Sequence, residues 1–336
     1  MVFENEGSMF KHLFIIMECS RVFSLPMTIL SWLVIFTFAM VDSGSILYGI
    51  IAFIGICFAH LGTNLIDDFF DYKALIKQVN FDKEEYLKHS QKTKCRYLIN
   101  GLMKESQLIF IAAVFFLISL LAGTILYIKC GEGVFYFTIA AGLIILLYPF
   151  VSRICLSELA VALAYGPLLF GGVYYVMTGA YLKEVIILSI PTMIMTVVLL
   201  YVHTIMDYEY DLNEGKATIA NRFNSRLDSL VVLKILLILA YLSLIFLCIF
   251  DILDWQVFLV YLTIPLAIDL YKSMLEYACN PDSIPVSKWY HFPMENLEVF
   301  KKRNEAAFMI RMFQSRNLMI YFSLLLVLSI FISLTL

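Results

Sequence analysis

The chain has 336 residues, of which 61% are hydrophobic and only 15% charged, with a mean hydropathy of +0.85. This composition excludes an ordinary soluble protein and indicates an integral membrane protein. The net charge of −3, from 24 basic and 27 acidic residues, provides no basic excess and argues against nucleic acid as a partner.

Apolar runs along the chain predict the membrane spans, because a helix needs about 20 apolar residues to cross a bilayer. Residues 1–20 lack a clean apolar stretch, and we expect a retained helix at the membrane interface there. The nine predicted spans are 22–41, 45–66, 107–128, 134–151, 158–178, 185–206, 229–250, 255–271 and 317–336. The sequence therefore predicts an all-α, polytopic protein. Residues 1–336 form a single membrane-embedded domain, a nine-transmembrane-helix bundle with cap loops on the cytoplasmic side.

Basic residues predict the orientation of the bundle. The loops after the odd-numbered spans hold only Lys129 and Lys183, whereas Lys and Arg gather on the other side. Because cytoplasmic loops are enriched in basic residues, we expect the N-terminus and three long loops, 67–106, 207–228 and 272–316, to be cytoplasmic. The protein is expected in the cell or inner membrane, with its active site on the cytoplasmic face.

Two acidic clusters close the second and the sixth span. Asp67, Asp68 and Asp71 have i,i+4 and i,i+3 spacing, which places them on one helical face. Asp207 and Asp211 repeat the i,i+4 spacing. Both clusters are predicted at the cytoplasmic end of an even-numbered span. Four spans separate them, as a parallel internal repeat would give.

Carboxylates crowded at the rim of an apolar bundle repel one another unless a cation neutralises them. Oxygen ligands without a nearby thiolate suit a hard divalent ion, and Mg²⁺ prefers carboxylates together with phosphate oxygens. The pattern therefore favours a Mg²⁺ site. The alternative is that each cluster only marks a helix end, with solvated acids.

Basic residues follow each cluster and could hold a diphosphate group. A substrate with a diphosphate head at the interface and a tail in the bilayer is an isoprenyl diphosphate. When the diphosphate leaves such a molecule, an allylic cation remains. The 28 Phe and 20 Tyr supply aromatic faces of the kind that stabilise a cation.

Two histidines beside the acidic clusters, and the clusters themselves, leave other interpretations open. His60 and His203 each lie one turn before a polar cluster residue, and each is either a contact to substrate or a histidine that only packs. A transporter with paired acidic ion sites is the alternative from another class, although transporter acids usually lie at mid-membrane beside broken helices.

The two clusters resemble the motifs of the UbiA-type intramembrane aromatic prenyltransferases, N-D-x-x-D-x-x-x-D and D-x-x-x-D. Within that superfamily the sequence most resembles the 1,4-dihydroxy-2-naphthoate polyprenyltransferases of menaquinone synthesis. Four stretches between about residues 20 and 250 carry the resemblance: Asn64-Leu65-x-x-Asp68-Phe69-Phe70-Asp71-Tyr72-Lys73; Arg96-x-x-x-x-Gly101; Ser157 to Val161 continuing to Tyr165-Gly166-Pro167 and Gly172 to Tyr175; and Asp207-x-x-x-Asp211-x-x-x-Gly215-Lys216-x-Thr218-Ile219.

The sequence departs from the family pattern at three places. Asp67 stands where the family has Asn, and Leu75 stands where the general first motif has its last carboxylate. The residues from His203 to Met206 replace a polar Asn-Asn-x-Arg. We expect Asp67 to replace the acid lost at Leu75, so the first motif keeps its carboxylates. The departure at His203 to Met206 therefore bears on the aromatic acceptor more than the others bear on the diphosphate donor.

The resemblance implies Mg²⁺-dependent transfer of an isoprenyl chain from a polyprenyl diphosphate to an aromatic acceptor, with 1,4-dihydroxy-2-naphthoate expected and hydroxybenzoate or homogentisate left open. Membrane lipids are the expected surroundings. The catalytic metal ligands it implies are Asp67, Asp68, Asp71, Asp207 and Asp211. The substrate-binding residues predicted beside them are Asn64, Lys73, Arg96, His203, Lys216 and Arg222.

Overall fold

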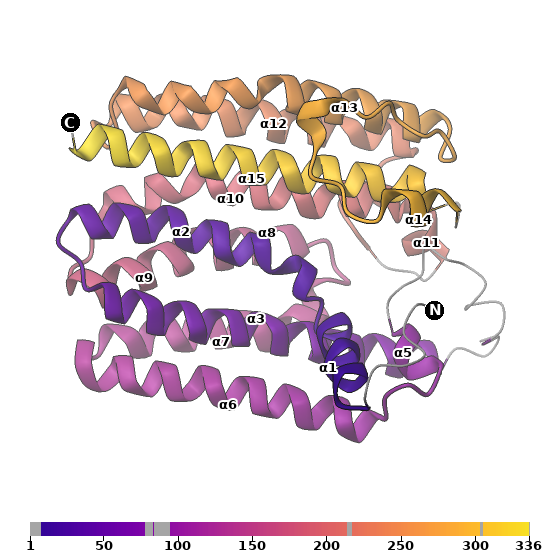
Figure 1. The fold of residues 1–336 in the computed structure, drawn as a ribbon, viewed down its shortest axis with the longest axis horizontal. Coiled ribbons are helices and arrows are strands. Elements are labelled where there is room, and N and C mark those ends of the chain that lie inside the picture. Colours follow the sequence, from indigo (N-terminus) through magenta and orange to yellow (C-terminus); the bar gives the residue numbers. More distant parts are fainter. Residues whose placement is uncertain (1–7, 78–82, 84–94, 214–216, 303–304, 336) are drawn as a thin grey trace.

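The computed structural model describes residues 8–77, 83, 95–213, 217–302 and 305–335, and its path is drawn in Figure 1. Nine helical segments within these residues are long and apolar enough to span a membrane, as predicted. They are η1–α2 (Val22–Val41), α3 (Ile46–Leu75), α6 (Glu105–Cys130), α7 (Gly133–Val151), α8–η2–α9 (Ser157–Thr178), α10 (Lys183–Met206), α12 (Arg226–Ile249), η4–α13 (Trp255–Cys279) and α15 (Ala306–Thr335). In the described parts of the chain, β-structure is limited to an isolated bridge between Ile154 and Ala217.

Shorter elements precede the first span or lie between the spans. They are α1 (Ser8–Cys19), α5 (Arg96–Ile99), α11 (Tyr208–Asn213), η3 (Ala220–Arg222), η5 (Trp289–His291) and α14 (Leu297–Lys302). Figure 1 shows α1, α5, α11 and α14 at the same end of the bundle, while α15 finishes at the opposite end. The ends of α3 and α10 that carry the acidic clusters therefore lie at the end with the long connections.

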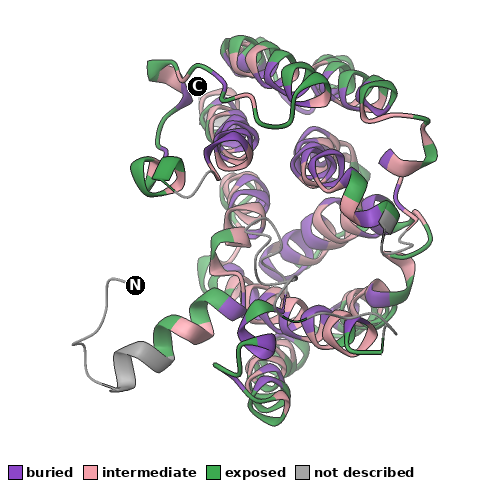
Figure 2. Cartoon of the chain, turned by 90° about the vertical axis from the view of Figure 1, so that its right-hand side faces the viewer, coloured by how far each residue is buried: buried purple, intermediate pink, exposed green. Residues whose placement is uncertain are grey.

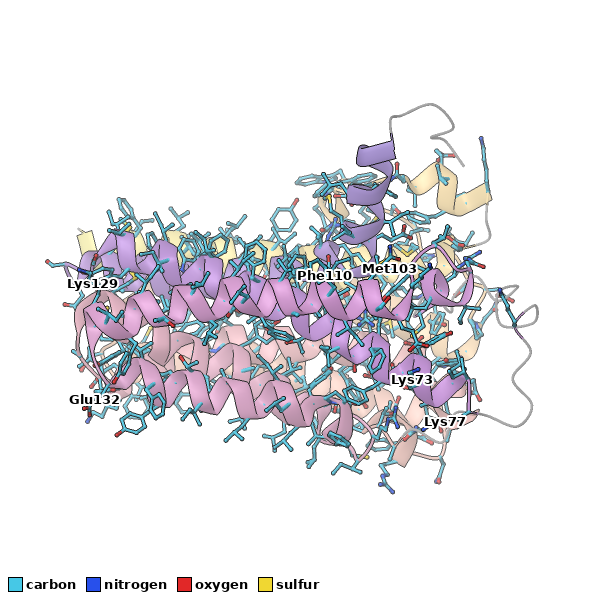
Figure 3. The ribbon with its side chains drawn as sticks, turned by 90° about the horizontal axis from the view of Figure 1, so that it is seen from below. Lys73, Lys77, Met103, Phe110, Lys129 and Glu132 are labelled. Carbon is cyan, nitrogen blue, oxygen red and sulfur yellow. The ribbon has the colours of Figure 1, made fainter. Side chains whose placement is uncertain are left out.

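Figure 2 shows exposed residues on the outer faces of the helices and buried residues toward the inside of the bundle, and many of the exposed residues are large and apolar. Phe110, Ile128 and Leu146 are about seven-tenths exposed, at 69%, 71% and 70%. A protein surrounded by water would cover most such residues, whereas lipid contacts them favourably. Figure 3 shows side chains of this kind along the outer faces of α6 and α7. Together with the nine spans, this surface is that of an integral membrane protein.

Helix α10 is the most enclosed span, with 67% of its most apolar window buried. It packs against α12, α15, α8, η2 and α2. The second acidic cluster directly follows this helix, so the position of that cluster is fixed by the packing of the bundle.

The fifth span is broken in its middle. Gly166 has φ −94° and ψ −108°, outside the helical region, and Pro167 follows inside a π-helical turn, Ala164–Leu168. A Cβ added at Gly166 would lie 2.7 Å from Sδ of Met193, so a larger residue here would require the Met193 side chain on α10 to move. π-helical turns are often found at functional sites, and irregular backbone is tolerated at membrane depth where it lines a cavity.

Three predicted span boundaries were misplaced. Helix α13 continues to Cys279 instead of ending at residue 271. Helix α3 continues to Leu75 instead of ending at residue 66, so the first acidic cluster lies within the helix. Helix α15 begins at Ala306 instead of at residue 317, which shortens the predicted cytoplasmic loop 272–316. Charged and polar side chains in its first turns, such as Arg311, lower the local hydropathy, although the structure buries them.

Arg311 is fully buried and ties this early part of α15 to its neighbours. Its guanidinium donates to the carbonyl oxygens of Ser273 (2.8 Å), Ser283 (2.8 Å) and Ala307 (2.7 Å) and lies 4.9 Å from the centroid of the Tyr277 ring. Several buried carbonyls therefore depend on this one cation.

We predict that Arg311→Met lowers the free energy of unfolding by about 2–5 kcal/mol, because buried carbonyl groups lose their donors. Unfolding in detergent, followed by circular dichroism during a denaturant titration, measures the change. Lys301→Met is the matched control, since Lys301 is exposed and pairs with Glu298 of its own helix. Equal midpoints for the two variants would contradict the prediction.

Candidate active site

A cavity of about 2400 Å³ lies between α2, α3, α6, α7, the fifth span, α10 and α15. Its lining on α7 runs from Val134 to Ser152, a length of about 27 Å at 1.5 Å per residue. Both acidic clusters contribute to one end of this cavity, while most of the remaining lining is apolar.

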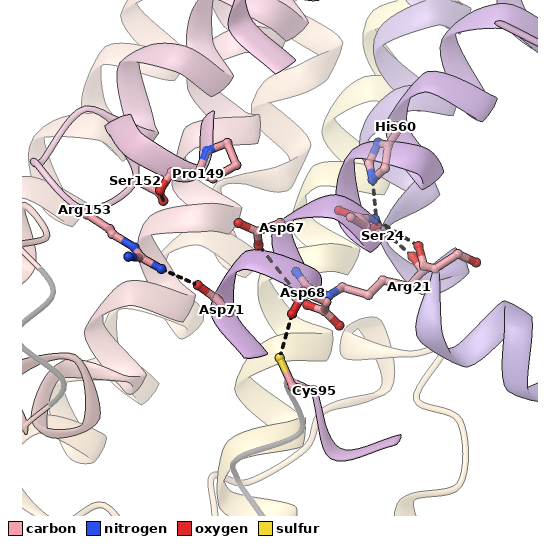
Figure 4. A network of polar contacts seen from close by, with 12 residues as sticks. Arg21, Ser24, His60, Asp67, Asp68, Asp71, Cys95, Pro149, Ser152 and Arg153 are labelled. Carbon is pink, nitrogen blue, oxygen red and sulfur yellow. Dashed lines mark hydrogen bonds and ion pairs between the residues drawn. The ribbon is translucent and has the colours of Figure 1, made fainter. Parts of the chain in front are cut away.

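The first cluster lies in the last turns of α3. Asp67 and Asp68 are buried, at 6% and 2% exposure, and both line the cavity. Asp71 lies farther along the helix and is not part of the lining; its carboxylate is 3.6 Å from the Arg153 guanidinium (Figure 4). The three acids therefore have different surroundings although they share a helix.

Arg21 neutralises the buried part of this cluster. Its guanidinium forms an ion pair with Asp68 and lies 3.7 Å from the Asp67 carboxylate. The residue has φ 55° and ψ 49°, in the left-handed region. This conformation is unfavourable for a side chain larger than glycine, and here it forms the turn between α1 and η1.

A second donor reaches Asp68 from α5. The Tyr97 hydroxyl donates to Oδ2 of Asp68 over 3.0 Å. Burial is the main cause that raises the pKa of Tyr97 above its usual range, so this hydroxyl stays protonated and remains a donor. Sγ of Cys95 donates to the backbone oxygen of Asp68 over 3.1 Å, which fixes the start of α5 against α3.

The second cluster follows the end of α10. The Asp207 N–H donates to the His203 carbonyl (2.9 Å), and the Asp211 N–H donates to the Asp207 carbonyl (2.8 Å). The helical turn is thus continued through α11, which keeps both acids at the cavity. Asp211 is buried at 7% exposure, while Asp207 is half-buried.

An arginine that sequence reasoning did not select lies beside this cluster. Arg226 begins α12, lines the cavity, and has a side chain only 11% exposed. Its buried Nε has no hydrogen-bond partner among the residues that the structure describes. The guanidinium lies 5.1 Å from the Tyr277 ring and 3.8 Å from the Glu209 carboxylate. A buried guanidinium nitrogen without a partner is available to an anionic ligand.

The structure brings most of the predicted site residues to the cavity and places others away from it. Those in the lining are Asn64, Asp67, Asp68, Arg96, His203, Asp207 and Asp211. Lys73 instead pairs with Glu105 at 2.5 Å, and Nε of Arg222 donates to Sγ of Cys155 over 3.1 Å. Lys216 lies outside the described residues.

Arg21 and Arg226 are the cavity residues that the sequence indicated only weakly. An arginine at the start of the first span also satisfies the orientation rule. Arg226 is one of several basic residues after the second cluster, and spacing alone does not select it from the others. The signal that finds both is burial, which the sequence does not contain.

The described residues contain no group of three or more His, Cys, Asp or Glu side chains close enough together to hold a metal ion by themselves. The acids stand on separate elements around one cavity, α3 on one side and α10 with α11 on the other. An ion between them would need further oxygen ligands from a bound molecule.

A long cavity within nine spans, with acids and arginines at one end and a mostly apolar remainder, suits a molecule with a polar head and an apolar tail held inside a membrane protein. The sequence profile of the UbiA prenyltransferase family matches residues 25–290. The chain therefore belongs to this family and is a prenyltransferase. No curated protein matches the sequence.

Solved structures share the fold. A UbiA homolog from Archaeoglobus fulgidus bound to GPP and Mg²⁺ is 14% identical, with a TM-score of 0.57 over 89% of this chain and 97% of its own. An apo UbiA homolog from Aeropyrum pernix K1 is 15% identical, with a TM-score of 0.57 over 84% and 94%. A structure concerning digeranylgeranylglyceryl phosphate synthase is 16% identical, with a TM-score of 0.56 over 96% and 99%.

We predict that Arg21→Met lowers the free energy of unfolding by about 3 kcal/mol, because the buried Asp68 carboxylate loses its cation. The double variant Arg21→Met/Asp68→Asn should recover much of this loss, since a neutral amide needs no counter-charge. A double-mutant cycle on denaturant unfolding in detergent measures the coupling. Losses that simply add would show that the ion pair does not stabilise the site.

Proposed function

We propose that the protein transfers an isoprenyl chain from a polyprenyl diphosphate to 1,4-dihydroxy-2-naphthoate, the reaction of menaquinone biosynthesis, with Mg²⁺ as cofactor. The observation that carries the donor half is the shared cavity: two acidic clusters line one end of it, and the cavity extends for about 27 Å along α7 with a mostly apolar lining. This shape suits a charged head and a long apolar tail. A transporter with paired acidic ion sites is disfavoured, because the chain belongs to a prenyltransferase family.

The residues present fit Mg²⁺. The donors that line the cavity at its polar end are carboxylate oxygens, the ligand type that a hard ion prefers. Asp67, Asp207 and Asp211 are the proposed ligands, with diphosphate oxygens completing the ion's coordination. The homolog from Archaeoglobus fulgidus is bound to both GPP and Mg²⁺, which supports a shared site of this kind. When bound, Mg²⁺ neutralises the diphosphate and helps it to leave as an anion.

Asp68 and Asp71 have a positioning role in this proposal. Asp68 is held by Arg21 and Tyr97, so it fixes the end of α3, and Asp71 is close to Arg153. Asn64 donates to the Ser20 carbonyl over 3.0 Å, which ties the same helix to the turn at Arg21. These contacts fix the end of α3 and orient Asp67 toward the cavity.

Arg96 and Arg226 are the proposed cationic contacts to the diphosphate, since both line the cavity. Positive charge at the departing diphosphate stabilises it more strongly as the bond to the isoprenyl carbon breaks. Lys216 remains a proposed contact from the sequence motif. Lys73 and Arg222 are less suited, because each has another partner away from the cavity.

The acceptor half rests on the sequence motifs shared with the naphthoate-prenylating group. The isoprenyl carbon bonds to the ring carbon that carries the carboxyl group, and carbon dioxide leaves. We further propose that the polar end of the cavity faces the cytoplasm, following the distribution of Lys and Arg.

The test is prenyl transfer by the purified protein in lipid nanodiscs, with radiolabelled farnesyl diphosphate and Mg²⁺ or EDTA. 1,4-Dihydroxy-2-naphthoate, 4-hydroxybenzoate and homogentisate are compared as acceptors. A Mg²⁺-dependent lipid product with the naphthoate alone supports the proposal. Product with another acceptor only would reject the menaquinone assignment while keeping the donor chemistry.

We predict that Asp67→Asn and Asp207→Asn each lower kcat/KM by about 1000-fold, since each removes a charged ligand at the departing diphosphate, worth about 4 kcal/mol in the transition state. Their melting temperatures in detergent should stay near that of the parent. Glu132→Gln is the control, because Figure 3 places Glu132 at the end of the bundle opposite Lys73. Activity near the parent value in either Asp variant would remove that residue from the proposed metal site.

We predict that Arg226→Met raises the KM for farnesyl diphosphate about 10- to 100-fold, because a charge-assisted contact worth about 1.5–3 kcal/mol is lost. Arg222→Met is the matched control and should change the same KM less than about twofold. Initial rates at saturating acceptor measure both. A larger increase in this KM for Arg222→Met than for Arg226→Met would assign the diphosphate contact to Arg222, as the sequence motif suggested.

A further inference from the structure

A second polar group lines the same cavity away from the acids. It consists of Ser24 and Thr28 on the first span, His60 on α3 and Tyr165 in the π-helical turn of the fifth span, and it is called the His60 cluster below. His60 lies seven residues before Asp67 on α3, a rise of about 10 Å along the helix. Ionisable side chains within a span are costly and usually have a functional reason.

The hydrogen bonds of Ser24 determine which nitrogen of His60 carries the proton. The Ser24 hydroxyl donates to the Arg21 carbonyl over 2.7 Å, so its only hydrogen is used. Its oxygen also lies 2.7 Å from Nε2 of His60 (Figure 4) and 3.2 Å from Nδ2 of Asn64. Ser24 therefore accepts both contacts, and the His60 proton is on Nε2.

Nδ1 of His60 then has a single lone pair and two hydroxyl groups in reach. The Tyr165 hydroxyl lies 2.5 Å from Nδ1, and the Thr28 hydroxyl lies 2.6 Å from it. The two hydroxyl oxygens are 3.5 Å apart, at the limit of a hydrogen bond. One lone pair accepts one good hydrogen bond, and the nearer Tyr165 hydroxyl takes it. Among the described residues, the Thr28 hydroxyl is then left with the long 3.5 Å contact to the Tyr165 oxygen, so its O–H is a surplus donor.

We propose that this surplus donor binds a ring hydroxyl oxygen of the prenyl acceptor, so that the His60 cluster is the acceptor-recognition site. The inference rests on the proposed function and specifies how its second substrate is held. With the diphosphate at the acids, a ring bound about 10 Å deeper lies beside the isoprenyl carbon that must react. Tyr165 and Thr28 are specificity-determining residues, and His60 positions them.

The chemistry of the cluster favours a hydroxyl over a carboxylate. None of its four side chains carries a fixed positive charge, and Nε2 of His60 already donates to Ser24. A carboxylate would be better held by the arginines at the polar end of the cavity, where Arg21 and Arg226 lie. The ring is therefore oriented with a hydroxyl toward His60.

Tyr165→Phe and Thr28→Val test the inference. Nδ1 uses whichever hydroxyl remains, so each single variant removes the surplus donor. Each should raise the KM for 1,4-dihydroxy-2-naphthoate about tenfold and leave the KM for farnesyl diphosphate within about twofold. The matched controls are Tyr241→Phe and Thr192→Val, which alter residues that do not line the cavity. Equal acceptor KM values in the variants and their controls would overturn the inference.

Analogue binding separates hydroxyl recognition from a general packing defect. The inhibition constants of 1-hydroxy-2-naphthoate and 4-hydroxy-2-naphthoate are measured against the parent and both variants. The variants should raise the inhibition constant of the analogue that keeps the recognised hydroxyl about tenfold. The inhibition constant of the other analogue should stay nearly unchanged. Equal weakening of both analogues, or of neither, would overturn the proposal.

Failure of the proposed function gives a different result. If the parent protein uses 4-hydroxybenzoate instead, the naphthoate assignment is wrong, and the same comparison is made with benzoate as the analogue without a hydroxyl. If the parent protein transfers to no hydroxylated ring, this inference is overturned together with the acceptor half of the proposed function.

Discussion

Negative charge held in an apolar bundle is the constraint on which the site depends. Asp67, Asp68 and Asp211 are each less than 8% exposed, and carboxylates so placed need cations or donors nearby. For Asp68, Arg21 supplies the cation and the Tyr97 hydroxyl supplies a hydrogen-bond donor. The ion pair in turn requires the left-handed turn at Arg21, and that turn fixes where the first span begins.

The same constraint explains why the fold places its most enclosed helix where it does. Asp207 and Asp211 follow α10, which is packed by neighbours on several sides, so the second cluster has little freedom to move away from its like charges. Tyr277 donates to the Met206 carbonyl over 3.3 Å and also stacks with Arg226 and Arg311. The end of α10, the start of α12 and the early turns of α15 are therefore held by one ring.

The sequence was sufficient for the nine spans and for the two acidic clusters, because both depend on local patterns. Apolar runs of about 20 residues and carboxylates at i,i+4 spacing are visible without any tertiary contact. The start of α15 was misplaced because hydropathy treats Arg311 as exposed, whereas its charge is satisfied by distant carbonyls. The sequence does not distinguish Arg222 from Arg226 for a similar reason. They are four residues apart, and only the packing shows that Arg226 is the one that lines the cavity.

The cavity is ordered by polarity along its length, and this order constrains the chemistry. Carboxylates and arginines occupy one end, the neutral hydroxyls around His60 lie about 10 Å deeper, and apolar side chains line most of the rest. A diphosphate is stabilised only at the end with the carboxylates and arginines. An isoprenyl tail is stabilised only along the apolar part of the lining. An acceptor ring has apolar faces and a polar edge, so it suits the middle level, where hydroxyl donors stand beside apolar walls. In the proposed function, the chain separates its two substrates by solvation, and the carbon that must react lies between the charged and the neutral polar groups.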